Sequence, residues 1–424
     1  MRSFVPTLIP LSALFAGGAL VHISTLNDGV RGKALMSLAV LWCLVLVVLR
    51  TKLSKIELKW ILLAGVTLRV CGFFAEPFTS HDGLRYLADG AALLQGLNPL
   101  DIPYIEQPLQ FQESWPVFYE HRPYTSIYPP LALALFAAAA STGVLYAWWT
   151  WKALSLVTSV VITIELGRLC QINTVIRPIF FWFALHPLLI IETTVAPHID
   201  LFVLVPLLFW LKYRARGLSS QTMFWLGLAS LIKPTILLGG LAFLKQLSKR
   251  SLAAVALLMS LIGVSILTLR IMSVEAPWGA DFGTFLKGWH FGSLLDSLLF
   301  WNAEPLAAVQ RISILLCLSG IYFWLRRGRA SFFGDYGDLL FLSLACSPVV
   351  FPWYLIILTI WIGQREVPII VWWSTSLLTY EVLDSFDLDT TWSPSSWPNQ
   401  FTVIILILWA LSRRINSFML VRPQ

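Results

Sequence analysis

The sequence predicts an all-α polytopic membrane protein, and three observations support this fold class. The chain has 424 residues, of which 57% are hydrophobic and only 12% are charged, whereas about 25% of the residues in a soluble domain are charged. Apolar runs recur along the whole chain, many of them close to the ~20 residues that cross a bilayer as a helix. The 20 Trp and 27 Phe suit spans whose aromatic side chains gather at the membrane interfaces. We therefore expect one membrane domain over residues 1–424, not a soluble protein with buried helices.

Most of the apolar runs are candidate spans, but two segments are irregular. Residues 131–142 are apolar but short, and residues 222–246 contain Lys233-Pro234. Proline lacks the backbone donor that a helix interior needs. We therefore expect residues 222–246 to form a broken, re-entrant helix pair that returns to its starting side. The other candidate spans are residues 4–24, 34–49, 60–75, 146–167, 178–194, 199–212, 251–269, 306–325, 337–350, 353–363, 367–383 and 401–412.

The basic residues predict the orientation of these spans. Twenty of the 30 Lys and Arg residues fall in loops on one side of the predicted topology, and the side that is rich in short basic loops is cytoplasmic. This arrangement requires that residues 131–142 do not cross the membrane. It places the long loop over residues 76–145 outside.

This outer loop contains seven of the 23 acidic residues, between Glu76 and Glu120. Ser80-His81-Asp82 lies at its start, and a carboxylate at the membrane surface can accept a proton from a hydroxyl group. The alternative role of Ser80 or Asp82 is to cap the helix that follows. Apolar spacing over residues 83–96 predicts an amphipathic helix that lies in the membrane interface and ends at Gly96.

Other polar residues fall at or near membrane depth, where ionisable groups are costly and are functional candidates. Glu192 and the run His198-Ile199-Asp200 lie at the outer ends of two spans. Ordinary polarity of an outer loop is the alternative for them. Lys233 could neutralise a phosphate or could be a snorkelling lysine. Trp353-Tyr354 could contact substrate or belong to an aromatic belt.

Several classes of function find no support in the sequence. It contains no Gly-rich nucleotide loop, no HExxH motif and no Cys-rich metal motif. The basic residues are distributed as expected for the cytoplasmic loops of a membrane protein, so we expect no nucleic-acid partner. Asp384, Asp387 and Asp389 are spaced like a calcium site, but a solvated loop is the simpler interpretation. We predict no metal ligands and no certain cofactor.

The order of several motifs resembles that of the GT-C glycosyltransferases, most closely the bacterial polyprenyl-phosphate-dependent mannosyltransferases and the GPI-anchor mannosyltransferases. Each motif is weak alone, and the resemblance rests on their order. The motifs are SHD at 80–82, RY at 85–86, Asp89, GLNP at 96–99, YPPL at 128–131, His186-Pro187 through Asp200, LIKP at 231–234, and Ser347-Pro348 through Pro352-Trp353-Tyr354.

The resemblance implies a GT-C-like bundle of about 11–13 transmembrane helices. Residues 1–59 would be extra N-terminal helices, and residues 76–145 would form a large first catalytic loop carrying interfacial helices. It also implies a multi-pass protein of the bacterial inner membrane, with its active site facing the periplasm or exterior. The partners would be a polyprenyl-phosphate sugar donor, a lipid or glycan acceptor, and membrane lipids. The family often has two acids at the position where this chain has His81-Asp82. The resemblance therefore allows a divalent cation as a cofactor but does not require one.

The implied function is transfer of a hexose, with mannose suggested by the resemblance, from the lipid-linked donor to an acceptor hydroxyl. The catalytic residues would be Asp82, as general base in an inverting reaction, and His81, which would orient Asp82 or bind phosphate. The donor phosphate would contact Lys233, Arg85, His198 and Arg270. Further substrate contacts would come from Tyr86, Asp89, Tyr128, Glu192, Asp200, Trp353 and Tyr354. The alternatives are a lipid-linked sugar transporter or flippase, which broken helices would suit, and a noncatalytic scaffold subunit.

Overall fold

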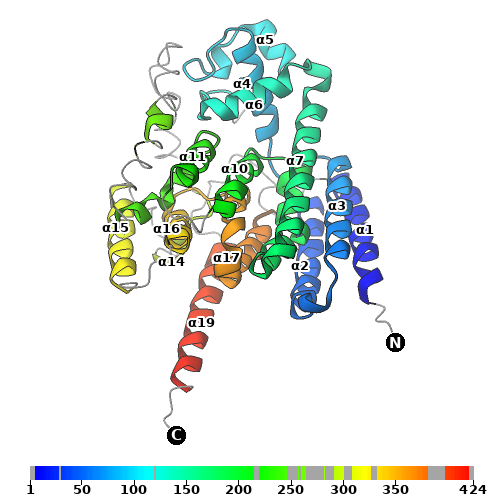
Figure 1. The fold of residues 1–424 in the computed structure, drawn as a ribbon. Coiled ribbons are helices and arrows are strands. Elements are labelled where there is room, and N and C mark those ends of the chain that lie inside the picture. Colours follow the sequence, from blue (N-terminus) through cyan, green and yellow to red (C-terminus); the bar gives the residue numbers. More distant parts are fainter. Residues whose placement is uncertain are drawn as a thin grey trace.

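The protein is a bundle of helices with a cap across one end (Figure 1). The described part contains helices and no β-strand, and one isolated bridge joins Phe291 to Val349. The predicted all-α class is therefore confirmed. The computed structural model describes residues 5–27, 30–118, 121–213, 219–245, 256, 259–263, 281, 291–299, 308–325, 332–380 and 397–419.

The N-terminal helices form one edge of the bundle, with α1 packed along α3. Gly17 permits this close approach, because a Cβ atom there would lie 2.7 Å from the Cys71 sulfur. Helices occupy the first three predicted spans, and the second is longer at both ends than expected. The elements are α1 (Val5–Ser24), α2 (Val30–Thr51), η1 (Leu53–Lys55) and α3 (Leu58–Phe74).

The cap is formed by α4 (Asp82–Leu94), η2 (Tyr104–Glu106), α5 (Leu109–Ser114) and α6 (Pro130–Ala140). The predicted helix and its end at Gly96, which has φ +73°, are confirmed. Its predicted place in the membrane interface stays a prediction; most of α4 is buried, and the helix packs mainly on α6 and also contacts α7. Gly90 makes this possible, since a Cβ atom there would lie 2.3 Å from the Phe136 carbonyl carbon. At 11 residues, α6 is too short to cross a membrane.

A bend in the middle of the chain replaces the single span expected over residues 178–194. The helices before and after His186-Pro187 meet at 63°, because proline removes the donor that would continue the helix. The buried Arg69 guanidinium binds the carbonyls of Phe183 and Ala184, which lie at the end of α8, where carbonyls lack helical partners. The elements are α7 (Val144–Ile172), η4 (Thr174–Ile176), α8 (Arg177–Leu185), α9 (Pro187–Ile190), the π-helical η5 (Ile191–Val195) and α10 (Asp200–Tyr213).

The predicted break at Lys233-Pro234 is confirmed. Two short helices, α11 (Ser220–Ser230) and η7 (Pro234–Lys245), meet there; their re-entrant arrangement in a membrane stays a prediction. The span expected over residues 251–269 lies mostly outside the described residues. The following elements are α14 (Leu294–Leu299), α15 (Ala308–Leu325) and α16 (Phe332–Cys346), which begins before and ends before the span expected over 337–350.

The last described segments include a reversal of the chain. The run from Pro352 to Thr379 is long and apolar enough for one span. However, the Trp373 indole donates a hydrogen bond to the Leu355 carbonyl at 2.9 Å, which a straight helix of this length does not allow. The chain turns back at Arg365, whose backbone is not helical, so the two segments predicted here are confirmed. The elements are η8 (Pro352–Trp361), α17 (Ile362–Ser376), η9 (Leu377–Thr379) and α19 (Trp397–Met419).

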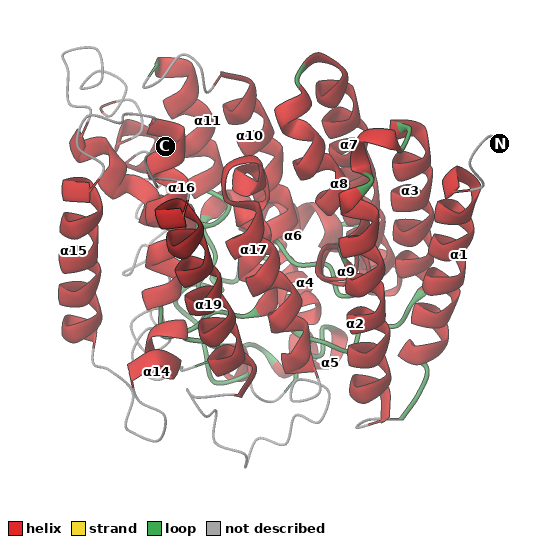
Figure 2. Ribbon diagram, turned by 90° about the horizontal axis from the view of Figure 1, so that it is seen from below, coloured by secondary structure: helices red, strands yellow, loops and turns green. Residues whose placement is uncertain are grey.

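By length and composition alone, three helical runs within the described residues could cross a membrane, one of them the Pro352–Thr379 run that folds back at Arg365, and the bent segment around Pro187 makes a fourth. Seen from the end, α1 and α15 lie at opposite edges and α10 and α17 lie between them (Figure 2). These apolar helices identify the chain as a membrane protein. The expected total of 11–13 spans stays a prediction.

Candidate active site

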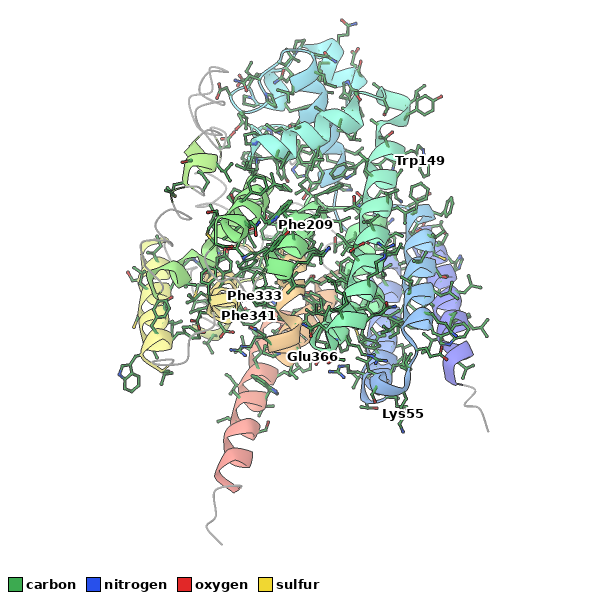
Figure 3. The ribbon with its side chains drawn as sticks, in the orientation of Figure 1. Lys55, Trp149, Phe209, Phe333, Phe341 and Glu366 are labelled. Atoms are coloured by element: carbon green, nitrogen blue, oxygen red, sulfur yellow. The ribbon has the colours of Figure 1, made fainter. Side chains whose placement is uncertain are left out.

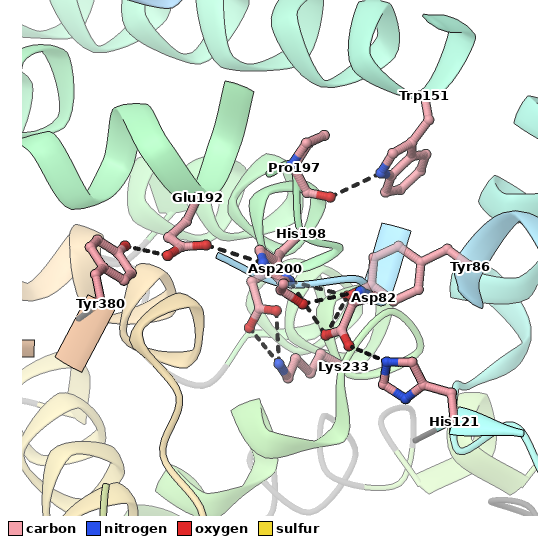
Figure 4. Close-up of polar contacts among 11 residues, drawn as sticks. Asp82, Tyr86, His121, Trp151, Glu192, Pro197, His198, Asp200, Lys233 and Tyr380 are labelled. Atoms are coloured by element: carbon pink, nitrogen blue, oxygen red, sulfur yellow. Dashed lines mark hydrogen bonds and ion pairs between the residues drawn. The ribbon is translucent and has the colours of Figure 1, made fainter. Parts of the chain in front are cut away.

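Asp82 is the first residue of α4, and its carboxylate faces three polar side chains (Figure 4). His121 Nε2 lies 3.5 Å from Oδ1, and His198 Nδ1 lies 3.6 Å from Oδ2. The Tyr86 hydroxyl donates to Oδ2 at 3.4 Å. Ser80 Oγ accepts a hydrogen bond from the Asp82 amide at 3.0 Å. Ser80 therefore satisfies the amide of the first residue of α4, and the Asp82 carboxylate remains available for the site.

His198 lies between two carboxylates. Its Nε2 is 3.1 Å from the Glu192 carboxylate, on the opposite side of the ring from Asp82. Glu192 is fully buried in the π-helix η5 and also accepts a hydrogen bond from the Tyr380 hydroxyl. The His198 ring stacks on Trp353 with 4.0 Å between ring centres. This row of side chains links Tyr380, near the end of α17, to Asp82 in the cap.

The histidines set the charge of the site. Burial alone would raise the pKa of Asp82, but the hydrogen bond and charge of His198, together with the charges of His121 and Lys233, lower it to about 2. Burial alone would lower the pKa of His198, but Asp82 and Glu192 raise it to about 9. At neutral pH, Asp82 is therefore an anion and His198 a cation.

A lysine lies close behind this pair. Lys233 Nζ donates to both carboxylate oxygens of Asp200, at 2.6 and 2.8 Å, and lies 3.6 Å from the centre of the Tyr354 ring. Asp200 begins α10 and Lys233 directly precedes the break at Pro234, so two segment ends bring the ion pair together. The pairing excludes the snorkelling alternative for Lys233, because its ammonium group is held inside the protein.

Arg85 connects α4 to the loop that contains His121. Its Nε donates to Asp89 Oδ1 at 2.7 Å, one turn further along the helix. Its other nitrogens donate to the backbone carbonyls of His121 and Tyr124. Arg85 is only 6% exposed and Asp89 only 4%, so this ion pair fixes the position of His121 relative to Asp82.

A pocket opens beside Asp82. Asp281 closes part of its wall, because its carboxylate accepts from the Thr125 amide at 2.7 Å and its own amide donates to Thr125 Oγ1 at 3.1 Å. Two segments distant in sequence therefore meet at the pocket. Its wall also includes Asp82, Arg85, Asp89, His121, Tyr124, Ser126, Ile127, Tyr128, Phe351 and Tyr354.

Comparison with known proteins decides the family. The family model MptA_B, described as "Alpha-(1->6)-mannopyranosyltransferase, N-terminal domain", matches residues 6–272, which is more than half of the chain. The chain belongs to this mannosyltransferase family. No curated protein and no solved structure matches it. The resemblance to mannosyltransferases is thus confirmed, and the family implies a sugar donor and an acceptor.

The mannosyltransferase brings together most of the predicted site residues. Asp82, Tyr86, Glu192, His198 and Trp353 form one contact network, and the pair Lys233–Asp200 adjoins it through Tyr354. Tyr128 and Asp89 lie on the pocket wall. Glu192 and Trp353 are buried, so loop polarity and an aromatic belt do not explain them. The individual roles of these residues stay predictions.

Two further predicted site residues are His81 and Arg270. His81 stacks on Phe118, with 3.4 Å between ring centres, so the histidine that faces Asp82 Oδ1 is His121. Arg270 lies outside the described residues, as do Asp384, Asp387 and Asp389. Among the described residues, no group of three His, Cys, Asp or Glu side chains could hold a metal ion.

Sequence reasoning missed two residues of the mannosyltransferase site. His121 is one of only six histidines in the chain and lies in the acidic loop, and that rarity was a signal that could have identified it. Tyr380 gave no comparable signal, because nothing in the sequence connects it with Glu192, 188 residues away.

Proposed function

We propose that this chain transfers mannose from a polyprenyl-phosphate-linked donor to an acceptor hydroxyl on the outer membrane face, with inversion of the anomeric centre. The observation that carries the proposal is the ionised Asp82 carboxylate on the wall of a pocket, held between two histidines with a lysine behind it. Membership of a mannosyltransferase family supports the choice of mannose.

In the proposed reaction, Asp82 acts as general base on the acceptor hydroxyl. The hydroxyl oxygen attacks the anomeric carbon, the bond from that carbon to the phosphate oxygen breaks, and the lipid phosphate leaves with the electron pair. One displacement inverts the anomeric configuration. A hydroxyl that is forming a bond to an electron-poor carbon becomes acidic, so a weak but fully ionised base suffices for this step.

The departing phosphate gains negative charge, which a positioned cation stabilises. Lys233 is the candidate, and it would have to exchange part of its contact with Asp200 for the phosphate. Arg85 is a weaker candidate, because its guanidinium group already binds Asp89 and two carbonyls. His198 contributes a fixed positive charge close to Asp82.

The outer location rests on the distribution of basic residues. A test is to introduce a cysteine at exposed Glu106 in a variant that lacks the five native cysteines. Labelling by a membrane-impermeant maleimide in intact cells supports the outer location. Labelling only after the membrane is opened contradicts it.

The function is tested with purified protein, a panel of polyprenyl-phosphate sugars and simple mannoside acceptors. We expect transfer from polyprenyl-phosphate mannose, with a product whose anomeric configuration, determined by NMR, is opposite to that of the donor. Transfer from a nucleotide sugar alone would overturn the assigned donor class. Movement of the intact donor across liposomes without sugar transfer would favour a flippase.

A further inference from the structure

The carboxylate of Asp82 has a different histidine beside each of its oxygens. His121 Nε2 lies 3.5 Å from Oδ1, and His198 Nδ1 lies 3.6 Å from Oδ2. The distances are almost equal, but the surroundings of the two rings differ. This difference determines which of them can remove a proton from Asp82.

His198 is unable to accept another proton. Both of its ring nitrogens face carboxylates, and its side chain is only 2% exposed, with one face covered by Trp353. An imidazole between two buried carboxylates is held as the cation, so it stabilises charge but has no free position for a further proton.

His121 has a different environment. Its side chain is 17% exposed and lies on the pocket wall, where water can reach it. Its backbone is held by Arg85, so the ring stays beside Asp82. The charged and titratable groups near it include Asp82, Arg85 and Asp89 from α4, and the same pocket wall carries Tyr124, Tyr128, Asp281 and Tyr354.

We propose that His121 is the proton exit of the site: it takes the proton that Asp82 has accepted and passes it to water in the pocket. The step rests on the proposed function. The acceptor proton moves first to Asp82 Oδ1 as the new glycosidic bond forms and the phosphate leaves, then to His121 Nε2. Loss of a proton from the imidazolium to water restores the resting state, so no other reactant is needed.

The proton affinities of a carboxyl group and an imidazole agree with transfer from Asp82 to His121. The hydrogen bond and charge of His198 by themselves lower the pKa of Asp82, so Asp82 releases its proton readily even while His121 is neutral, and histidine is the side chain that exchanges protons between pH 5 and 8. Asp82 lines the same pocket and its side chain is 18% exposed, but an imidazole is a much stronger proton acceptor than water, so transfer to His121 is the favoured path.

The test compares His121→Gln with the wild-type enzyme, and uses His22→Gln as control because His22 is an exposed histidine on α1. We expect kcat of His121→Gln to fall about 10- to 100-fold, less than the 10²–10⁴-fold loss expected for removing the base. The donor KM should stay within about two-fold. Added imidazole should restore part of kcat. Wild-type kcat should decline between pH 7 and 5, the range in which histidine takes up protons, and this decline should be absent in His121→Gln.

Three outcomes separate this proposal from the proposed function. If His121→Gln keeps the wild-type kcat and the wild-type pH profile, the assignment of His121 as the proton exit is wrong. The proposed function still holds in that case if Asp82→Asn is inactive. A loss of kcat that imidazole does not restore in His121→Gln or His121→Asn, with unchanged thermal unfolding, indicates a structural role and also overturns it. Full activity of Asp82→Asn overturns the assigned base itself.

Discussion

The two ends of the helix bundle hold their carboxylates in different ways. At the end opposite the cap, where Glu366 and Lys55 lie (Figure 3), Glu366 is bound by the Arg50 guanidinium group, with one contact of 2.7 Å, and by the Trp182 indole at 2.7 Å. At the cap end, the neighbours of Asp82 stand 3.4–3.6 Å away. Charge-assisted hydrogen bonds are usually 2.7–2.9 Å long, so the contacts of Asp82 are loose.

The difference separates a structural carboxylate from a reactive one. Glu366 joins α2, α8 and α17, three helices distant in sequence, and each of its oxygens has a donor. Asp338 is clamped in a similar way by Arg365 at the turn between η8 and α17. Asp82 is ionised without being clamped and lies on a pocket wall, so a substrate hydroxyl can approach it.

The largest expected effect comes from Asp82→Asn. An amide of the same shape does not accept the proton, so kcat should fall about 10²–10⁴-fold. The long contacts of Asp82 suggest little loss of folding, so thermal unfolding should stay near the wild-type temperature. Glu106→Gln, an exposed carboxylate of the same cap, is the control and should keep its activity. Normal transfer by folded Asp82→Asn would contradict the assignment of Asp82 as the reactive carboxylate.

Lys233→Met should have the next largest effect, a loss of about 10²-fold in kcat/KM for the donor, because the phosphate loses its cation. The variant should also lose stability, since Asp200 becomes an uncompensated buried charge. The double variant Asp200→Asn/Lys233→Met separates the two effects. We expect it to regain stability in thermal unfolding but not transfer, and recovery of both would exclude Lys233 from donor binding.

Glu366→Gln should lower the stability of the protein and leave its catalytic activity nearly unchanged. Removing the charge that binds Arg50 should lower the free energy of unfolding by about 1–3 kcal/mol, while kcat of the folded enzyme stays within about two-fold. Glu57→Gln removes an exposed ion pair with Lys59 and should change stability by less than about 1 kcal/mol. Denaturant titration in detergent measures both. Equal effects of the two substitutions would show that the Glu366 cluster is not structural.

The smallest effect should appear at alkaline pH. The folded-state pKa of His198 is raised to about 9 from 6.5, so its cation contributes stability in full below pH 6.5 and loses it as pH rises to about 9. We expect kcat to fall a few-fold above pH 9, together with the unfolding temperature. His198→Gln should remove this alkaline change. An unchanged profile up to pH 10 would contradict the charge assigned to His198.

The sequence by itself determined the elements that depend on local composition. Apolar runs located most of the described helices, Pro234 located the break beside Lys233, and Gly96 located the end of α4. Each of these features follows from hydrophobic length or from the backbone limits of one residue. The candidate base at Asp82 was also predictable from the sequence, because it rests on a local motif and on a family resemblance.

Only the tertiary structure decided which side chains surround that base. Contacts between Asp82 and His198 or between Glu192 and Tyr380 join residues more than 100 positions apart, and no periodic pattern records them. The burial of α4 likewise depends on Gly90 meeting the backbone of α6. Local residues specify helices and their ends, but the environment of Asp82 arises from the packing of helices brought together from across the chain.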